Sequence, residues 1–185
     1  MDLDWTKELV DQLDWHWRVS LRPRLGGLTD EEYFDEPVRE CWNVRPRGDS
    51  TAPVQGGSGA FVIEFQMPAP EPAPVTTIAW RLGHVIVGVL AMRSASHFGG
   101  PPTDYMVHDY AGTAAGALAQ LDDAYGQWIG GVRGLDADCL AAPCGPAEGP
   151  YAEFPMATLV LHINREVLHH GAEIALLRDL YRHRH

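Results

Sequence analysis

Apolar residues recur with a helical spacing in four separate segments, and this pattern limits the fold of the chain more than any other feature. The segments are residues 5–21, residues 78–96, residues 110–130 and a last one that begins near Pro155 and runs almost to the C-terminus. Side chains three or four residues apart lie on one face of a helix, so each segment predicts a helix with an apolar face. Four such helices predict an all-α fold, a four-helix bundle.

The second of these segments is expected to be the most deeply buried. Residues 78–96 are apolar or small on every side except at Arg81, His84 and Arg93. No face of this helix is therefore suited to contact with water. A pair of threonines precedes the segment, and a threonine hydroxyl can cap the first turn.

Residues 37–75 separate the first two predicted helices and differ from them in composition. They contain seven prolines and four glycines, which disfavour a long helix because proline lacks an amide donor and glycine is costly to order. A long Pro/Gly-rich loop is predicted instead, with one short extended piece, packed onto the bundle through its apolar residues. Loops of this length usually carry function. Residues 1–185 are interpreted as a single domain.

The balance of charge argues against two classes of partner. The 185 residues include 25 acidic and 14 basic side chains, a formal net charge of −11. Such a field repels nucleic acids and anionic membrane surfaces. The acidic N-terminus does not resemble a secretory signal, and no run reaches the roughly 18 uncharged apolar residues of a membrane span. We therefore expect a cytoplasmic protein without nucleic-acid or membrane partners. The three cysteines lack a CxxC spacing and predict neither a disulfide framework nor a zinc knuckle.

Two residues of the last helix combine metal-ligand chemistry with a buried position. Glu166 and His170 are four residues apart, which places them one turn apart on one face, within the apolar stripe. A buried carboxylate needs a compensating charge, and a cation supplies one. His84 is the histidine of the apolar second helix. His84, Glu166 and His170 are therefore candidate ligands of one divalent ion.

The spacing alone leaves other interpretations of these residues open. A buried histidine is commonly a hydrogen-bonded core residue, and a glutamate and a histidine four apart form a salt bridge about as often as a ligand pair. His162 lies one turn before Glu166 and is a candidate partner of its carboxylate, whereas His169 is expected at the flank of the stripe. The remaining histidines are expected on helix surfaces, at helix ends, in loops or in the C-terminal tail: His16, His97, His108, His183 and His185.

Two stretches resemble the signatures of a known family. The run TTIAWRLGH at residues 76–84 resembles the second-helix signature of the DinB-like superfamily, and EVLHHGAEI at residues 166–174 resembles its last-helix signature. The resemblance extends over nearly the whole chain. It is closest to the branch that includes the N-terminal domain of mycothiol-dependent maleylpyruvate isomerase.

This resemblance implies a four-helix bundle with a metal at one end, held by His84, Glu166 and His170. Many relatives have histidine at the position of Glu166, whereas the isomerase branch has glutamate. Two histidines and a carboxylate leave coordination positions open, as in catalytic zinc sites. Zinc is the ion expected first, and nickel and iron suit the same donors.

The resemblance also implies an activity. In the isomerase branch the metal binds a low-molecular-weight thiol and favours the nucleophilic thiolate. We therefore predict a metal-dependent thiol transferase or isomerase that uses mycothiol or bacillithiol and an electrophilic substrate, with residues 37–75 shaping the substrate pocket. The isomerase has an additional C-terminal domain for which this chain is too short, so a substrate other than maleylpyruvate is expected.

Two further hypotheses belong to other classes. One is a non-catalytic metal-binding stress-response protein, which could form a homodimer through a face of the bundle. The other is metal-dependent hydrolysis, which needs a general base near the ion. The sequence does not identify such a base.

Overall fold

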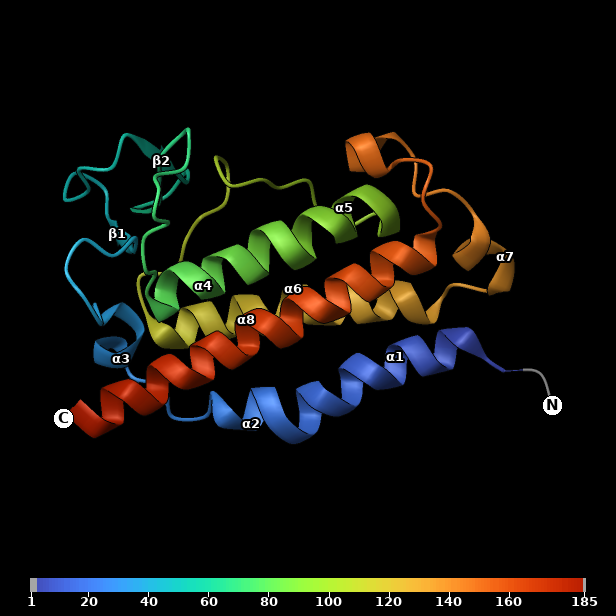
Figure 1. Cartoon of the computed structure of the whole chain (residues 1–185), viewed down its shortest axis with the longest axis horizontal. Coiled ribbons are helices and arrows are strands. Elements are labelled where there is room, and N and C mark those ends of the chain that lie inside the picture. Colours follow the sequence, from blue (N-terminus) through green and yellow to red (C-terminus); the bar gives the residue numbers. More distant parts are fainter. Residues whose placement is uncertain (1–2, 185) are drawn as a thin grey trace.

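The computed structural model describes residues 3–184 and is mostly helical, with one small sheet (Figure 1). The helices are α1 (Trp5–His16), η1 (Trp17–Leu21), α2 (Arg22–Arg24), α3 (Asp30–Phe34), α4 (Ile78–His84), η2 (Val85–Ala91), α5 (Met92–Phe98), α6 (Ala114–Arg133), α7 (Ala137–Ala141), η3 (Pro146–Tyr151) and α8 (Met156–Arg184). The strands are β1 (Val44–Pro46), β2 (Val54–Gly56) and β3 (Phe61–Phe65). Four long helical segments run lengthwise beside one another: α1 with η1 and α2, α4 with η2 and α5, α6, and α8 (Figure 1).

The four long segments share one apolar core. α6 packs against η2 and α1, and α8 packs against α1, α4 and η2. One residue from each segment is completely buried: Leu13, Val87, Trp128 and Val167. Burial of an aliphatic side chain stabilises a fold by about 1.5–3 kcal/mol relative to exposure. The apolar faces predicted from the sequence are therefore the faces that pack.

Capping side chains set where three of the helices begin. Asp4, Thr77 and Thr113 cap α1, α4 and α6, and each accepts a hydrogen bond from a backbone amide of the first turn. This interaction satisfies an amide that has no partner within the helix. Because Thr113 is the cap, α6 begins at Ala114 rather than near residue 110, where the sequence pattern had placed its start.

Residues 44–65, within the 37–75 segment, contain a three-stranded antiparallel sheet where one short extended piece was expected, so the all-α class is corrected to a mostly helical fold with a small sheet. The strand order is β1-β3-β2. Val44 pairs with Ile63 across the first ladder, and Val54 pairs with Phe65 across the second. The three strands are only three to five residues long, too short for their periodicity to stand out between prolines and glycines.

The sheet packs on the beginning of α4. The indole N–H of Trp80 donates to the carbonyl oxygen of Glu64, 2.8 Å away. The rings of Phe65 and Trp80 meet edge to face, with their centroids 5.6 Å apart. The sheet is thus fastened to the helix that carries His84.

The run Ile78–Phe98 is long and apolar enough, by length and composition, to cross a membrane. In the folded chain, however, 61% of its apolar window is buried. This run is the core helix of the fold, and the structure is consistent with a soluble protein.

Candidate metal centre

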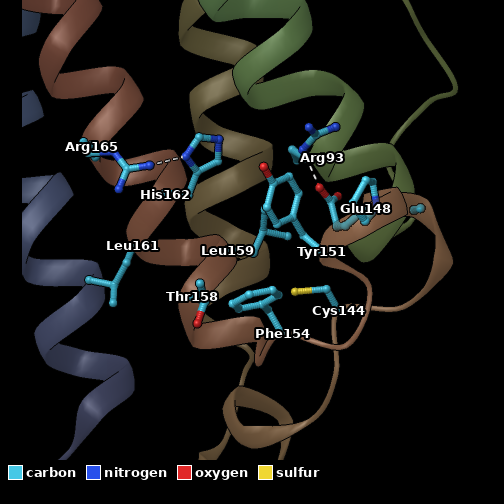
Figure 2. Close-up of a pocket in the computed structure, with 12 residues that line it drawn as sticks. Arg93, Cys144, Glu148, Tyr151, Phe154, Thr158, Leu159, Leu161, His162 and Arg165 are labelled. Atoms are coloured by element: carbon cyan, nitrogen blue, oxygen red, sulfur yellow. Dashed lines mark hydrogen bonds and ion pairs between the residues drawn. The ribbon is translucent and has the colours of Figure 1, made fainter.

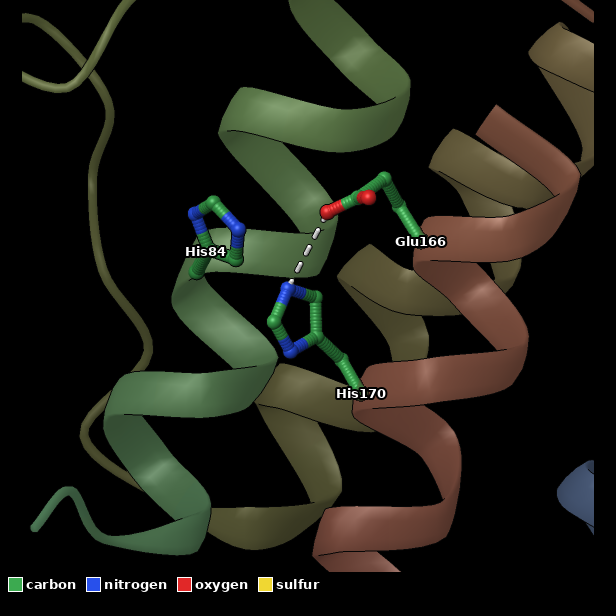
Figure 3. Close-up of side chains that lie close together, drawn as sticks. All are labelled: His84, Glu166 and His170. Carbon is green, nitrogen blue, oxygen red and sulfur yellow. Dashed lines mark ion pairs between the residues drawn. The ribbon is translucent and has the colours of Figure 1, made fainter. Parts of the chain in front are cut away.

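The structure brings the three candidate ligands together. His84 ends α4, whereas Glu166 and His170 lie one turn apart on α8, which packs against α4. One donor atom from each residue lies within 4.8 Å of the other two. Figure 3 shows the Glu166 carboxylate and both imidazole rings converging on the space between the two helices. The sequence-predicted set is therefore a spatial cluster that could bind a metal.

Two of the donors form an ion pair whose length also suits a metal site. Nε2 of His170 and Oε2 of Glu166 are 3.4 Å apart. In a tetrahedral zinc site with bonds of about 2.0–2.1 Å, two ligand atoms are about 3.3 Å apart. Two imidazoles and one carboxylate also match the ligands of catalytic zinc sites.

A carboxylate holds the ring of His170. Nδ1 of His170 lies 2.7 Å from Oε2 of Glu173, and Glu173 in turn forms an ion pair with Arg81 at 3.2 Å. Metal-bound histidines commonly donate the N–H of their other ring nitrogen to a carboxylate, which fixes the ring and its tautomer. Glu173 thus leaves Nε2 of His170 directed towards Glu166.

A tyrosine holds the ring of His84 in the same way. The hydroxyl of Tyr105 lies 2.5 Å from Nδ1 of His84, which leaves Nε2 available for an ion. The plane of the His84 ring is nearly parallel to the planes of the Trp80 and Tyr105 rings. Burial lowers the pKa of His84 to about 4, and the positive charges of His170 and Arg81 act in the same direction. His84 is therefore neutral near pH 7, the state in which imidazole binds metals.

The position of Tyr105 depends on the small sheet. It lies in the connection between α5 and α6, which the turn between β2 and β3 holds through backbone hydrogen bonds from Gly57 to Met106 and from Ser58 to His108. The rings of Phe65 and Tyr105 also meet edge to face. Residues 37–75 thus support the candidate centre indirectly, by fixing the segment that carries Tyr105.

Glycine is required where η2 passes Tyr105. Gly88 has no side chain, and an added Cβ would overlap the Tyr105 hydroxyl. η2 is a π-helical stretch that begins directly after His84. Such stretches occur often at functional sites.

Other predicted histidine positions are partly confirmed. His162 lies 3.7 Å from the Glu166 carboxylate, as its position one turn earlier predicts. His169 is exposed and pairs with Glu173 at 3.4 Å, so His169, His170 and Glu173 form a second cluster of donor atoms. His97 lies in the last turn of α5, at a helix end as expected, and its side chain is only 5% exposed and lies 2.9 Å from Glu148.

Two pockets adjoin the centre. The smaller, of about 240 Å³, is lined by His84, Glu166 and Tyr105, and the larger, of about 600 Å³, lies against the first turns of α8 (Figure 2). Arg93 and His162 line both pockets. The described lining of these two pockets includes no residue of the 37–75 segment, so the expectation that this segment shapes the substrate pocket is not met in either.

The sequence pattern did not identify Tyr105 and Glu173, which hold the two imidazole rings, or Glu148, which lines the larger pocket. Glu173 could have been found, because it lies three residues after His170 on the same helix face. Tyr105 and Glu148 lie in irregular connections, and no local pattern of the sequence relates them to α4 or α5.

Comparison with known proteins gives one family. The model of the DinB superfamily matches residues 12–174. No curated protein matches the chain, and no solved structure matches it. The matched range includes all three candidate ligands.

Proposed function

Since the chain belongs to the DinB superfamily, we propose that it is a metal-dependent enzyme of the thiol transferase or isomerase type. A divalent ion held by His84, Glu166 and His170 would activate a low-molecular-weight thiol. The observation that carries this proposal is the convergence of two imidazoles and one carboxylate beside pockets of about 240 and 600 Å³. A structural metal would need no such open side.

The residues around the ion have distinct roles in this proposal. His84, Glu166 and His170 bind the cation, while Tyr105 and Glu173 hold the two imidazole rings in position. When bound, the cation lowers the pKa of a thiol ligand and so favours the nucleophilic thiolate. The pocket residues hold the electrophile beside the thiol and exclude water.

The finer assignments rest on the chemistry of the donors and on resemblance. Zinc is the proposed ion because the donor set is that of catalytic zinc sites, and nickel or iron would also suit it. Glutamate at position 166, which is half-buried, favours the isomerase-like branch and hence mycothiol or bacillithiol as the thiol. A cytoplasmic location and a homodimer remain predictions.

A non-catalytic metal-binding stress-response protein is the alternative. It would use the same three ligands but would not bind a thiol at the ion. Thiol conjugation therefore separates the two functions.

The test is conjugation of mycothiol or bacillithiol to 1-chloro-2,4-dinitrobenzene by the zinc-loaded protein. The thiol sulfur forms a bond to the ring carbon, chloride leaves, and the thiol proton passes to solvent. We expect a rate well above that of the uncatalysed reaction, lost in His84→Ala and Glu166→Ala and retained in the surface variant His169→Ala. Zinc binding without any thiol binding or conjugation would favour the stress-response protein.

A further inference from the structure

The larger pocket lies between the connection after α7 and the first turns of α8. Its walls include Arg93 of α5, Tyr151 and Phe154 of the connection, and Leu159 and Arg165 of α8 (Figure 2). Its volume of about 600 Å³ is in the range of small-molecule sites, which is about 300–1,000 Å³. It meets the smaller pocket of the candidate metal centre at Arg93 and His162.

One end of this pocket is apolar and carries exposed aromatic rings. Tyr151 is 65% and Phe154 is 49% exposed, and their rings meet edge to face with centroids 5.8 Å apart. Leu161, also in the lining, is 55% exposed. Large apolar side chains that gather around a concavity are typical of ligand sites. Flat ring systems are suited to contact with such aromatic walls.

The end nearest the metal centre carries positive charge. Arg165 donates to Nδ1 of His162 at 2.6 Å, and its side chain is 69% exposed. Its ion pair with Glu166 is long, at 3.8 Å. A guanidinium has five N–H donors, so this exposed side chain keeps donors that can bind a carboxylate.

Glu148, the acidic residue in the pocket wall, does not repel a bound anion. The Glu148 side chain is 7% exposed, forms an ion pair with Arg93 at 3.3 Å and lies 2.9 Å from Nε2 of His97. Burial and the nearby Glu148 carboxylate raise the pKa of Cys144, so this thiol in the wall carries no charge near pH 7. The charge available to a ligand is therefore the positive charge of Arg165.

We propose that this pocket binds the electrophilic substrate, and that the substrate is an organic anion with an apolar, ring-bearing body and a carboxylate. The body lies against Phe154 and Tyr151, and the carboxylate pairs with Arg165 beside the metal centre. That the bound anion is a substrate rests on the proposed function. The preference of the pocket for such an anion does not depend on it.

Calorimetric titration of the metal-free chain with 2-naphthoate and its neutral counterpart 2-naphthamide tests the preference without metal or thiol. We expect naphthoate to bind about fivefold more tightly, the upper end for an exposed ion pair. Arg165→Gln should remove this difference, and Phe154→Ala should weaken both ligands about tenfold. The controls are Arg18→Gln, also a largely exposed arginine, and Leu176→Ala, an exposed leucine of α8 outside the pocket.

A second readout uses the unaltered chain. Naphthoate should slow alkylation of Cys144, which lines the pocket, and should leave that of the exposed Cys139 unchanged. Equal affinities for the two ligands, a preference that survives Arg165→Gln, or equal alkylation of Cys144 with and without naphthoate would overturn the proposal. Failure of thiol conjugation would leave these results untouched, so the two proposals fail separately.

Discussion

Each imidazole of the candidate centre is held at Nδ1 by an oxygen atom, from Tyr105 for His84 and from Glu173 for His170. A ring fixed in this way presents Nε2 without having to lose rotational freedom when an ion binds. Burial raises the pKa of Tyr105 to about 12, so its hydroxyl remains neutral and can accept the Nδ1–H of His84.

Tyr105→Phe removes only this hydroxyl and tests its role. Loss of an oxygen that orients a ligand typically lowers metal affinity by about 10–100-fold, and we expect about tenfold for zinc, measured by competition with a chromophoric chelator. Tyr151→Phe is the matched control, because Tyr151 is exposed and does not contact His84. Equal zinc affinity in the wild type and Tyr105→Phe would show that the hydroxyl has no part in the site.

A second tyrosine forms a hydrogen bond with a half-buried carboxylate of α1 and lowers its pKa. The Tyr125 hydroxyl donates to Asp14 at 2.6 Å, and this bond, with Arg18 as a further partner, lowers the pKa of Asp14 below its ordinary 3.8. A lowered pKa contributes stability above pH 3.8 that is lost as the pH falls through the folded-state pKa.

Tyr125→Phe should therefore lower the free energy of unfolding at pH 7 by about 1.5 kcal/mol, the contribution of a hydrogen bond to a charged group. The difference from the wild type should be constant from pH 7 to 5 and should shrink below pH 3.8. Urea unfolding at a series of pH values measures it. A difference that grows towards acid pH would have the wrong sign for this account.

The sequence was sufficient to predict the three candidate ligands, which the structure brings together, and insufficient for the groups that hold them. Glu166 and His170 can be recognised in the sequence because they lie one helical turn apart. His84 can be recognised because it interrupts an apolar helix. Tyr105 reaches the site through irregular backbone, whose path depends on contacts with distant segments. Local periodicity carries no information on such contacts.

At the scale of the elements, the helices followed their apolar stripes and caps, and the sheet did not follow from any local pattern. Its strands pair across turns of the 37–75 segment through backbone N–H and C=O groups. Every residue except proline has both groups, so the pairing leaves no mark on the sequence. The π-helical η2 was not predicted either, because its sequence is that of an ordinary apolar helix.

Gly88 of η2 gives a prediction at this scale. Gly88→Ala places a methyl group where the Tyr105 hydroxyl lies, so it should displace Tyr105 from His84 and weaken zinc binding as Tyr105→Phe does, by about tenfold. Gly126→Ala is the control: it lies in α6, nothing is within 4 Å of an added Cβ, and replacing a helical glycine stabilises by about 0.5–1 kcal/mol. Unchanged zinc affinity in Gly88→Ala would mean that the close approach has no bearing on the centre.

At the scale of the whole molecule, the candidate centre joins α4 and α8, which are far apart in the sequence and packed together in the fold. An ion bound only by the folded chain stabilises it by about 2.7 kcal/mol at a free concentration of 100 times Kd. For a chain of this size each kcal/mol raises Tm by about 2–4 °C, so zinc should raise Tm by about 5–11 °C in scanning calorimetry. His84→Ala should abolish the increase, and an equal increase in that variant would place the ion elsewhere.

Zinc content per chain, measured by elemental analysis after loading and dialysis, tests the centre most directly because two donor clusters share His170. We expect one zinc per chain in the wild type and in His169→Ala, and little or none in His84→Ala and Glu166→Ala. Equal zinc in all four proteins, or zinc lost from His169→Ala but kept in His84→Ala, would contradict this expectation.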